Sequence, residues 1–75
     1  MRQAFSGTSL REHRLRAGLP ITLFAARCGI SSATLVRYEA GATAPPVATL
    51  SAMAEVLGID MAELLEEAPH DAVAV

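Results

Sequence analysis

The side chains that most often perform chemistry in proteins are scarce in this sequence. Among its 75 residues there are two histidines, His13 and His70, and one cysteine, Cys28. Their spacing suits neither a metal site nor a nucleophile–base pair, and the glycines form no phosphate-binding loop. Cys28 falls on the apolar face of an expected helix, where a thiol is usually buried and inert. We therefore expect no enzyme, no metal site and no cofactor.

The arginines are the other side chains with binding chemistry, and they are distributed unevenly. Residues 1–38 hold all six of them and a single acid, Glu12, which gives a balance of +5. Residues 39–75 hold seven acids and no lysine or arginine, so the whole chain carries a net charge of −2. A guanidinium donates a fixed fork of hydrogen bonds that fits a phosphate group or a guanine edge. The first half of the chain is therefore the half that suits nucleic acid.

The elements that must position these arginines are two short helices joined by a tight turn. Four apolar residues share one helical face and predict a helix over about residues 21–28: Ile21, Phe24, Ala25 and Cys28. Gly29 can end this helix at a positive φ. Ser31 is a candidate N-cap for a second helix over about residues 32–39, with Leu35 turned toward the core. This is the layout of a helix-turn-helix, whose second helix enters the major groove of DNA.

Further helix signals flank this pair. Capping boxes at Ser9-x-x-Glu12 and Asp60-x-x-Glu63 predict helices that begin near residues 9 and 60. A helix over about residues 47–57 follows a loop at 42–46, where two prolines exclude helix. No strand pattern is evident, so the expected class is all-α with five helices.

The domain organisation that follows is a single helical unit with short ends. Residues 1–8 are expected to form a flexible N-terminal arm, residues 9–68 the helix-turn-helix domain, and residues 69–75 a C-terminal tail. A chain of this length supports one modest core. A single cysteine suits a reducing compartment, and no apolar run is long enough for a membrane helix. We therefore expect a cytoplasmic protein with no membrane partner.

The ordered set of residues from about Leu10 to Leu65 resembles the phage repressor and Cro-type helix-turn-helix family, also called Xre-type. The marks of the resemblance are Arg14, Gly18-Leu19, Phe24-Ala25, Gly29-Ile30-Ser31, Thr34-Leu35, Arg37-Tyr38-Glu39, Gly41, Pro45, Thr49-Leu50, Ala54, Leu57-Gly58 and Glu63-Leu64-Leu65. The resemblance implies a five-helix, lambda-repressor-like DNA-binding domain. It also implies a sequence-specific transcriptional regulator that binds double-stranded DNA as a homodimer.

The same resemblance implies roles for particular residues. Bases would be read from the outward face of the second helix of the motif, by Ser32, Ala33 and Arg37. Arg37 could donate two hydrogen bonds to guanine, whereas Ala33 offers only a methyl group, for example to thymine. The DNA backbone would be held by Ser31, by backbone amides at Ala40 and Ala42, and by Arg27. Arg14 and Glu39 would form an ion pair that ties the first helix to the end of the third.

Two departures from the family pattern reduce the expected number of phosphate contacts. Ile21 stands where the family often has a polar residue, commonly glutamine, that contacts the DNA backbone. The loop at residues 42–44 is Ala-Thr-Ala, where the family often carries lysine or arginine. Few neutralised phosphates imply weak intrinsic affinity, so a dimer or a larger complex is expected to bind the DNA.

Two alternatives use the same fold for a different function. The first is a protein-interaction module, an antirepressor or adaptor, whose possible protein partner would bind an apolar patch of Ile21, Leu23, Val36 and Val47. The second is an antitoxin, whose acidic second half would bind a basic toxin. Salt-dependent binding to duplex DNA separates a regulator from an interaction module.

Overall fold

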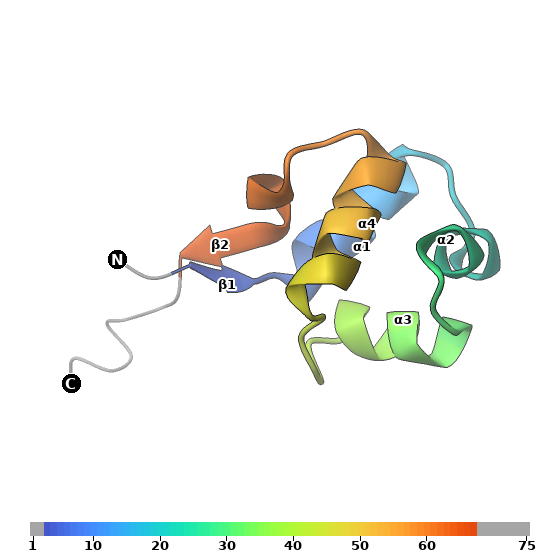
Figure 1. The fold of residues 1–75 in the computed structure, drawn as a ribbon, viewed down its shortest axis with the longest axis horizontal. Coiled ribbons are helices and arrows are strands. Elements are labelled where there is room, and N and C mark those ends of the chain that lie inside the picture. The colour runs from blue at the N-terminus through green and yellow to red at the C-terminus, as the bar shows by residue number, and fades with distance from the viewer. Residues whose placement is uncertain (1–2, 68–75) are drawn as a thin grey trace.

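The computed structural model describes residues 3–67, which form four α-helices, one 3-10 helix and one two-stranded antiparallel sheet. In chain order the elements are β1 (Gln3–Phe5), α1 (Gly7–Arg16), α2 (Ile21–Cys28), α3 (Ser32–Glu39), α4 (Val47–Leu57), the 3-10 helix η1 (Met61–Leu64) and β2 (Leu65–Glu67). Figure 1 shows the small sheet at one end, α2 and α3 at the other, and α1 and α4 between them. None of the helices in this range is long and apolar enough to cross a membrane.

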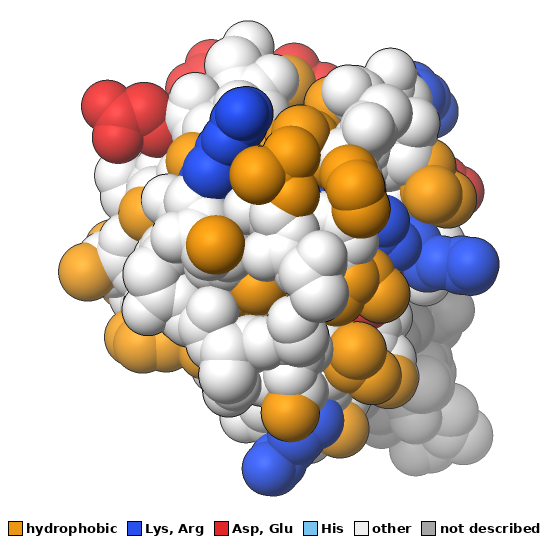
Figure 2. Space-filling view, turned by 90° about the vertical axis from the view of Figure 1, so that its right-hand side faces the viewer, with side chains coloured by type: hydrophobic (Ala, Val, Ile, Leu, Met, Phe, Trp, Pro, Cys, Tyr) orange, Lys and Arg blue, Asp and Glu red, His pale blue; other side chains and the backbone are white. Residues whose placement is uncertain are grey.

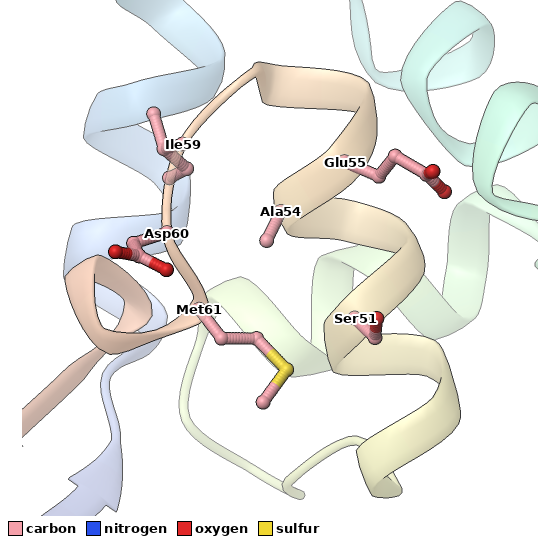
Figure 3. Close-up of a pocket in the computed structure, with 6 residues that line it drawn as sticks. All are labelled: Ser51, Ala54, Glu55, Ile59, Asp60 and Met61. Atoms are coloured by element: carbon pink, nitrogen blue, oxygen red, sulfur yellow. The ribbon is translucent and has the colours of Figure 1, made fainter.

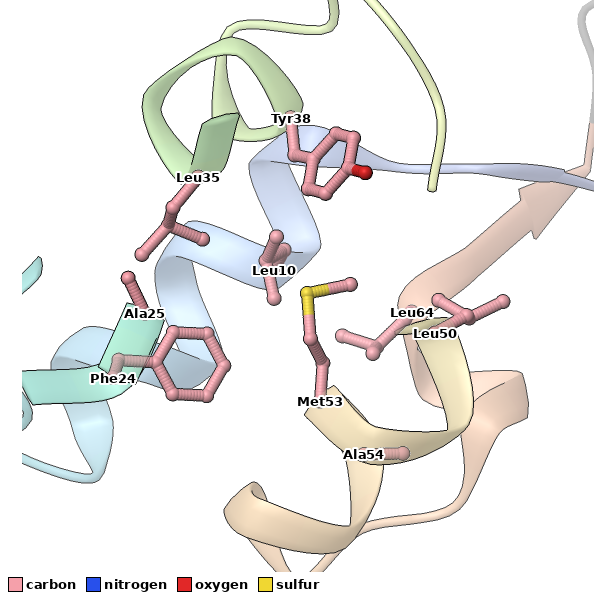
Figure 4. Close-up of a cluster of buried hydrophobic side chains, with 9 residues drawn as sticks. All are labelled: Leu10, Phe24, Ala25, Leu35, Tyr38, Leu50, Met53, Ala54 and Leu64. Atoms are coloured by element: carbon pink, nitrogen blue, oxygen red, sulfur yellow. The ribbon is translucent and has the colours of Figure 1, made fainter. Parts of the chain in front are cut away.

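Nine buried hydrophobic residues from α1 to η1 form a single core, drawn in Figure 4. They are Leu10, Phe24, Ala25, Leu35, Tyr38, Leu50, Met53, Ala54 and Leu64. Figure 4 shows Leu10 and Met53 near the centre, between Phe24, Leu35 and Leu64. Burying one such large side chain contributes about 1.5–3 kcal/mol. Helices of 8–11 residues are marginal alone, so this shared core rather than intrinsic propensity holds them.

The turn between α2 and α3 fixes how the second helix leaves the first. Gly29 has φ 76°, a left-handed conformation that few other residues adopt without strain. The Ile30 amide then donates to the Ala25 carbonyl across 3.0 Å and closes the end of α2. Ala25 is almost fully buried and, in Figure 4, points toward Leu35 of α3. A small residue there lets the two helices pack closely, so the predicted helix-turn-helix is present.

The N-terminal residues differ from the predicted flexible arm at 1–8. Residues 3–5 form β1, which pairs with β2, and the Ser6 amide donates to the Leu64 carbonyl across 2.8 Å. The Ser6 hydroxyl accepts from the Ser9 amide at 3.1 Å, so α1 is capped by Ser6 and begins at Gly7. The Ser9 capping box therefore does not start this helix. Phe5 packs this segment against α3, because its ring meets the Tyr38 ring edge-on, with the two ring centroids 6.3 Å apart.

The predicted fifth helix at residues 60–67 is also replaced. Met61–Leu64 form one 3-10 helix, and Asp60 makes no side-chain capping bond. Leu65 then turns extended, with φ −116° and ψ 154°, and begins β2. Pairing with β1 satisfies backbone groups that a longer helix would otherwise have to satisfy. The predicted tail at residues 69–75 lies outside the described residues.

Candidate nucleic-acid interface

The solvent-facing side of α3 is one continuous stripe. Its exposed residues recur at the i, i+3, i+4, i+7 spacing of a single helical face: Ala33, Val36, Arg37 and Ala40. On the opposite side of the helix, Leu35 and Tyr38 are buried in the core. The side chain of Ser32, in the first turn, is half-buried. Of the predicted base readers, Ala33 and Arg37 are therefore exposed, and Ser32 is partly exposed.

The Arg14 guanidinium and the Glu39 carboxylate form a forked ion pair. Arg14 Nε donates to Oε2 at 2.6 Å, and Nη2 donates to Oε1 at 3.1 Å. Arg14 Nη1 also donates to the Leu19 carbonyl oxygen at 2.9 Å. Both charged side chains are only 7% exposed. One side chain thus joins α1, the turn before α2 and the last residue of α3, and it fixes the angle at which α3 is presented.

Gly7 provides a second contact at the same end of α3, which sequence reasoning missed. A Cβ atom added to Gly7 would lie 2.4 Å from the Tyr38 carbonyl oxygen and 2.7 Å from that of Glu39. Contacts below 3.0 Å essentially never occur, so only glycine allows this approach. No local pattern could have revealed it, because the constraint comes from the backbone of a distant element. The start of α1 therefore abuts the end of α3.

Ser31 performs the capping role that its position predicts. Its hydroxyl oxygen accepts from the Thr34 amide at 3.1 Å, and its proton is donated to the Thr34 hydroxyl at 2.9 Å. A phosphate bound by this hydroxyl must therefore displace the bond to Thr34. The first role of Ser31 is to begin α3 at a fixed residue, and backbone contact remains a prediction.

The amides of Ala40 and Ala42, predicted to hold phosphates, are already engaged. Ala40 donates to the Val36 carbonyl and Ala42 to the Arg37 carbonyl, each at 3.0 Å. Gly41, at φ 76°, reverses the chain so that these bonds close the end of α3. The two amides therefore already have acceptors within the chain, and phosphate contact at Ala40 and Ala42 stays a prediction. The sequence already indicates this engagement, because the amide that follows a glycine at a helix end usually donates to a carbonyl of the last turn.

Four arginines remain available on the surface of the described residues. Arg11, Arg16, Arg27 and Arg37 are all exposed, and none of them makes a hydrogen bond or ion pair within residues 3–67. Figure 2 shows the face that includes α2 and α3, where the basic side chains stand apart among apolar and uncharged surface. The acidic side chains lie toward the margin of this view. The face is thus positive but sparsely charged.

A shallow hollow of about 340 Å³ adjoins the exposed stripe of α3. Its lining combines apolar and charged side chains from three helices: Arg11, Arg14, Ile21, Val36, Glu39 and Ala40. Ile21 begins α2 and is half-buried against the core. Leu23 and Val47, which the interaction-module alternative groups with Ile21 and Val36, are exposed but do not line this hollow. The four apolar residues of that alternative therefore do not line one common hollow.

Within residues 3–67 the remaining reactive side chains form no second site. Burial raises the pKa of the Cys28 thiol above its usual value, which lowers its thiolate fraction. His13 Nε2 lies 3.6 Å from a Glu63 carboxylate oxygen, a contact between α1 and η1. A hollow of about 380 Å³ beside α4 is lined by Glu55 and Asp60 among others, and Figure 3 shows their carboxylates well apart. Within residues 3–67 no group of acidic, histidine or cysteine side chains could hold a metal ion.

Comparison with known proteins gives the same architecture. The model of the helix-turn-helix family matches residues 10–64. The restriction-modification controller protein C.AhdI from Aeromonas hydrophila is 28% identical, with a TM-score of 0.74 over 77% of this chain and 88% of that one. The P22 c2 repressor in complex with a synthetic operator is 21% identical, with a TM-score of 0.78 over 84% and 96%. SinR in complex with DNA is 20% identical, with a TM-score of 0.73 over 77% and 94%. No curated protein matches the sequence.

The matched family model spans most of the chain and contains the whole turn between α2 and α3, so this protein belongs to the helix-turn-helix family of phage repressors and Cro-type regulators.

Proposed function

We propose that this protein binds duplex DNA in a sequence-specific way and regulates transcription. The observation that carries the proposal is the exposed stripe of α3, held rigidly at its end by the Arg14–Glu39 pair. In this arrangement α3 enters the major groove and α2 lies across the backbone. The similar structures support it, since one is a controller protein and two others were solved with operator or DNA.

The proposed base readers differ in what they recognise. Arg37 is exposed and can donate two hydrogen bonds to the N7 and O6 atoms of a guanine. Ser32 can donate to or accept from several bases, and Ala33 offers a methyl group. Arg27, exposed near the end of α2, is the proposed phosphate ligand on that helix. With three base-reading residues on one helix, each protomer is expected to recognise a short half-site rather than a long operator.

We further propose that the protein binds as a homodimer, in the cytoplasm, and acts by binding rather than by catalysis. Only a few exposed arginines can neutralise phosphates, and each contributes a fixed share of the salt-dependent affinity. Two linked protomers on a palindromic or repeated site add their contacts, which raises the affinity without any new type of contact.

Selection of bound sequences from a random duplex pool tests the proposal. The test compares wild type with Ala33→Glu, which places a negative charge on the proposed reading face of α3. Ala48→Glu is the matched control, because Ala48 is also an exposed helical alanine but lies on α4. We expect wild type and Ala48→Glu to enrich the same motif and Ala33→Glu to enrich none. If wild type enriches no motif at low salt, the protein-interaction module replaces the regulator.

A further inference from the structure

We infer that Val36 is a specificity-determining residue that contacts the C5 methyl group of a thymine beside the base read by Arg37. The inference rests on the proposed DNA binding and names a chemical feature of the DNA that this site selects. Neither the predicted base readers nor the predicted backbone contacts include Val36.

Val36 lies on the exposed side of α3. Val36 is 48% exposed, whereas the adjacent Leu35 is fully buried. It lies one turn from Ala33 and one turn from Ala40 along the same exposed stripe, and next to Arg37. Val36 and Arg37 therefore belong to the same exposed stripe of α3.

The side chains of the stripe determine which groups in the major groove they can contact favourably. Apart from Arg37, the side chains of the stripe can neither donate nor accept a hydrogen bond, because they belong to two alanines and a valine. In the major groove the thymine methyl is the one apolar group, and the other base edges are hydrogen-bond donors and acceptors. An apolar side chain against those polar edges strips them of water without replacing the hydrogen bond. Val36 therefore favours thymine and disfavours the alternatives.

The helix backbone limits the orientation of the Val36 side chain. Val36 lines the hollow of about 340 Å³ together with Ile21, next to the Arg14–Glu39 ion pair. A β-branched valine in a helix has one strongly preferred rotamer. The two valine methyl groups are thus positioned before any ligand arrives, which reduces the entropic cost of a contact.

The charges around the stripe favour DNA over a protein as its occupant. Arg11 lines the same hollow and Arg37 lies in the stripe, and both are exposed. Glu39, the acid in that lining, is neutralised by Arg14 at 2.6 Å. A polyanion with apolar groups between its phosphates complements this face, and the major groove of a thymine-containing duplex has that character.

Replacing thymine by deoxyuridine in the selected duplex, one position at a time, removes single methyl groups and tests the inference. The dissociation constant of each duplex is measured by fluorescence anisotropy for wild type, Val36→Ala and Val47→Ala. Val47 is the control, because it is also an exposed valine but begins α4. For wild type we expect about fourfold weaker binding at one or two positions beside the guanine read by Arg37. For Val36→Ala this ratio should fall to near one, and for Val47→Ala it should persist.

Several results would overturn the inference. One is a selected motif with no thymine beside that guanine, and another is equal affinity for thymine and deoxyuridine duplexes at every position. A full methyl effect beside that guanine that survives in Val36→Ala, or is lost equally in Val47→Ala, also overturns it. In these cases specific binding remains and only the role of Val36 fails. Undetectable binding to every duplex at low salt, with a protein partner bound through Val36, overturns the proposed function as well.

Discussion

Among single residues, Arg37 carries the most information about a binding site. It is exposed and makes no hydrogen bond or ion pair with any described residue, so its whole donor fork is available. Arg37→Ala should relax base preference at one operator position and cost about 1–3 kcal/mol there. A binding-site selection with both proteins measures this. The same motif from mutant and parent would remove Arg37 from the reading role.

Glu39 is expected to be the most sensitive acidic residue for stability. Its side chain is 7% exposed and accepts two hydrogen bonds from Arg14, so Glu39→Ala leaves a buried guanidinium without its counter-charge. We expect a loss of roughly 3–5 kcal/mol in the free energy of unfolding. Glu55→Ala, on the exposed side of α4, should stay within about 0.5 kcal/mol.

Urea denaturation measures the free energy of unfolding of both variants. The same measurement is made on a double variant that combines Arg14→Leu with Glu39→Leu. The double variant removes both charges, so it should lose less stability than Glu39→Ala alone. Equal losses for Glu39→Ala and Glu55→Ala would mean that the pair contributes little to the fold.

At the level of residues, resemblance and local chemistry were informative to different extents. The partnership of Arg14 with Glu39 came from the family resemblance, because no local pattern joins two residues so far apart in sequence. The cap at Ser31 followed from its position before a helix. The contact at Gly7 could not be predicted, since it depends on the carbonyl oxygens of Tyr38 and Glu39 in another helix.

At the level of elements, the close approach of α1 and α3 predicts a large effect from a very small substitution. Gly7→Ala adds one methyl group that collides with backbone atoms of α3 at 2.4 and 2.7 Å. Backbone cannot rotate away as a side chain can, so we expect a loss of about 1–3 kcal/mol or more. Thr8→Ala is the control, because Thr8 is exposed in the same turn. Thermal unfolding of both variants measures the difference, and equal melting temperatures would contradict the close contact.

The start of α2 allows a second test at this level. Ile21 begins the helix and lines the hollow beside α3, where the family often has a polar residue. Ile21→Gln should add a hydrogen bond to the DNA backbone, worth roughly 1 kcal/mol, and tighten binding to specific and scrambled duplexes alike. Leu23→Gln, an exposed apolar position outside the hollow, should leave both affinities unchanged. Tightening on the specific duplex alone would show that Ile21 does not face the backbone.

The helices of the motif and α4 were predicted more accurately than the ends of the described chain. The ranges 21–28, 32–39 and 47–57 agree with α2, α3 and α4, because apolar spacing and glycine or proline stops are local signals. The sheet was missed because β1 and β2 lie at opposite ends of the described sequence, so no local pattern joins them. Three-residue strands such as Gln3–Phe5 are too short to show alternation.

At the level of the whole molecule, charge distribution sets the expected strength of DNA binding. Arg14 is committed to the ion pair and Arg37 is assigned to a base, so the remaining candidates for phosphates are Arg2, Arg11, Arg16 and Arg27. Arg2 lies outside the described residues, and the other three are exposed. Each neutralised phosphate contributes about −0.9 to the slope of log affinity against log salt. A protomer should therefore show a slope no steeper than about −4, and a dimer about twice that.

The central claim is that α3 recognises a particular duplex, and an affinity measurement at two salt concentrations tests it most directly. Fluorescence anisotropy would compare the selected duplex with a scrambled duplex of the same length and composition. We predict that the selected duplex binds roughly a thousandfold tighter or more at the higher salt, with a dimer slope no steeper than about −8. Equal affinity for the two duplexes at both salt concentrations, or no detectable binding at the lower one, would contradict the account.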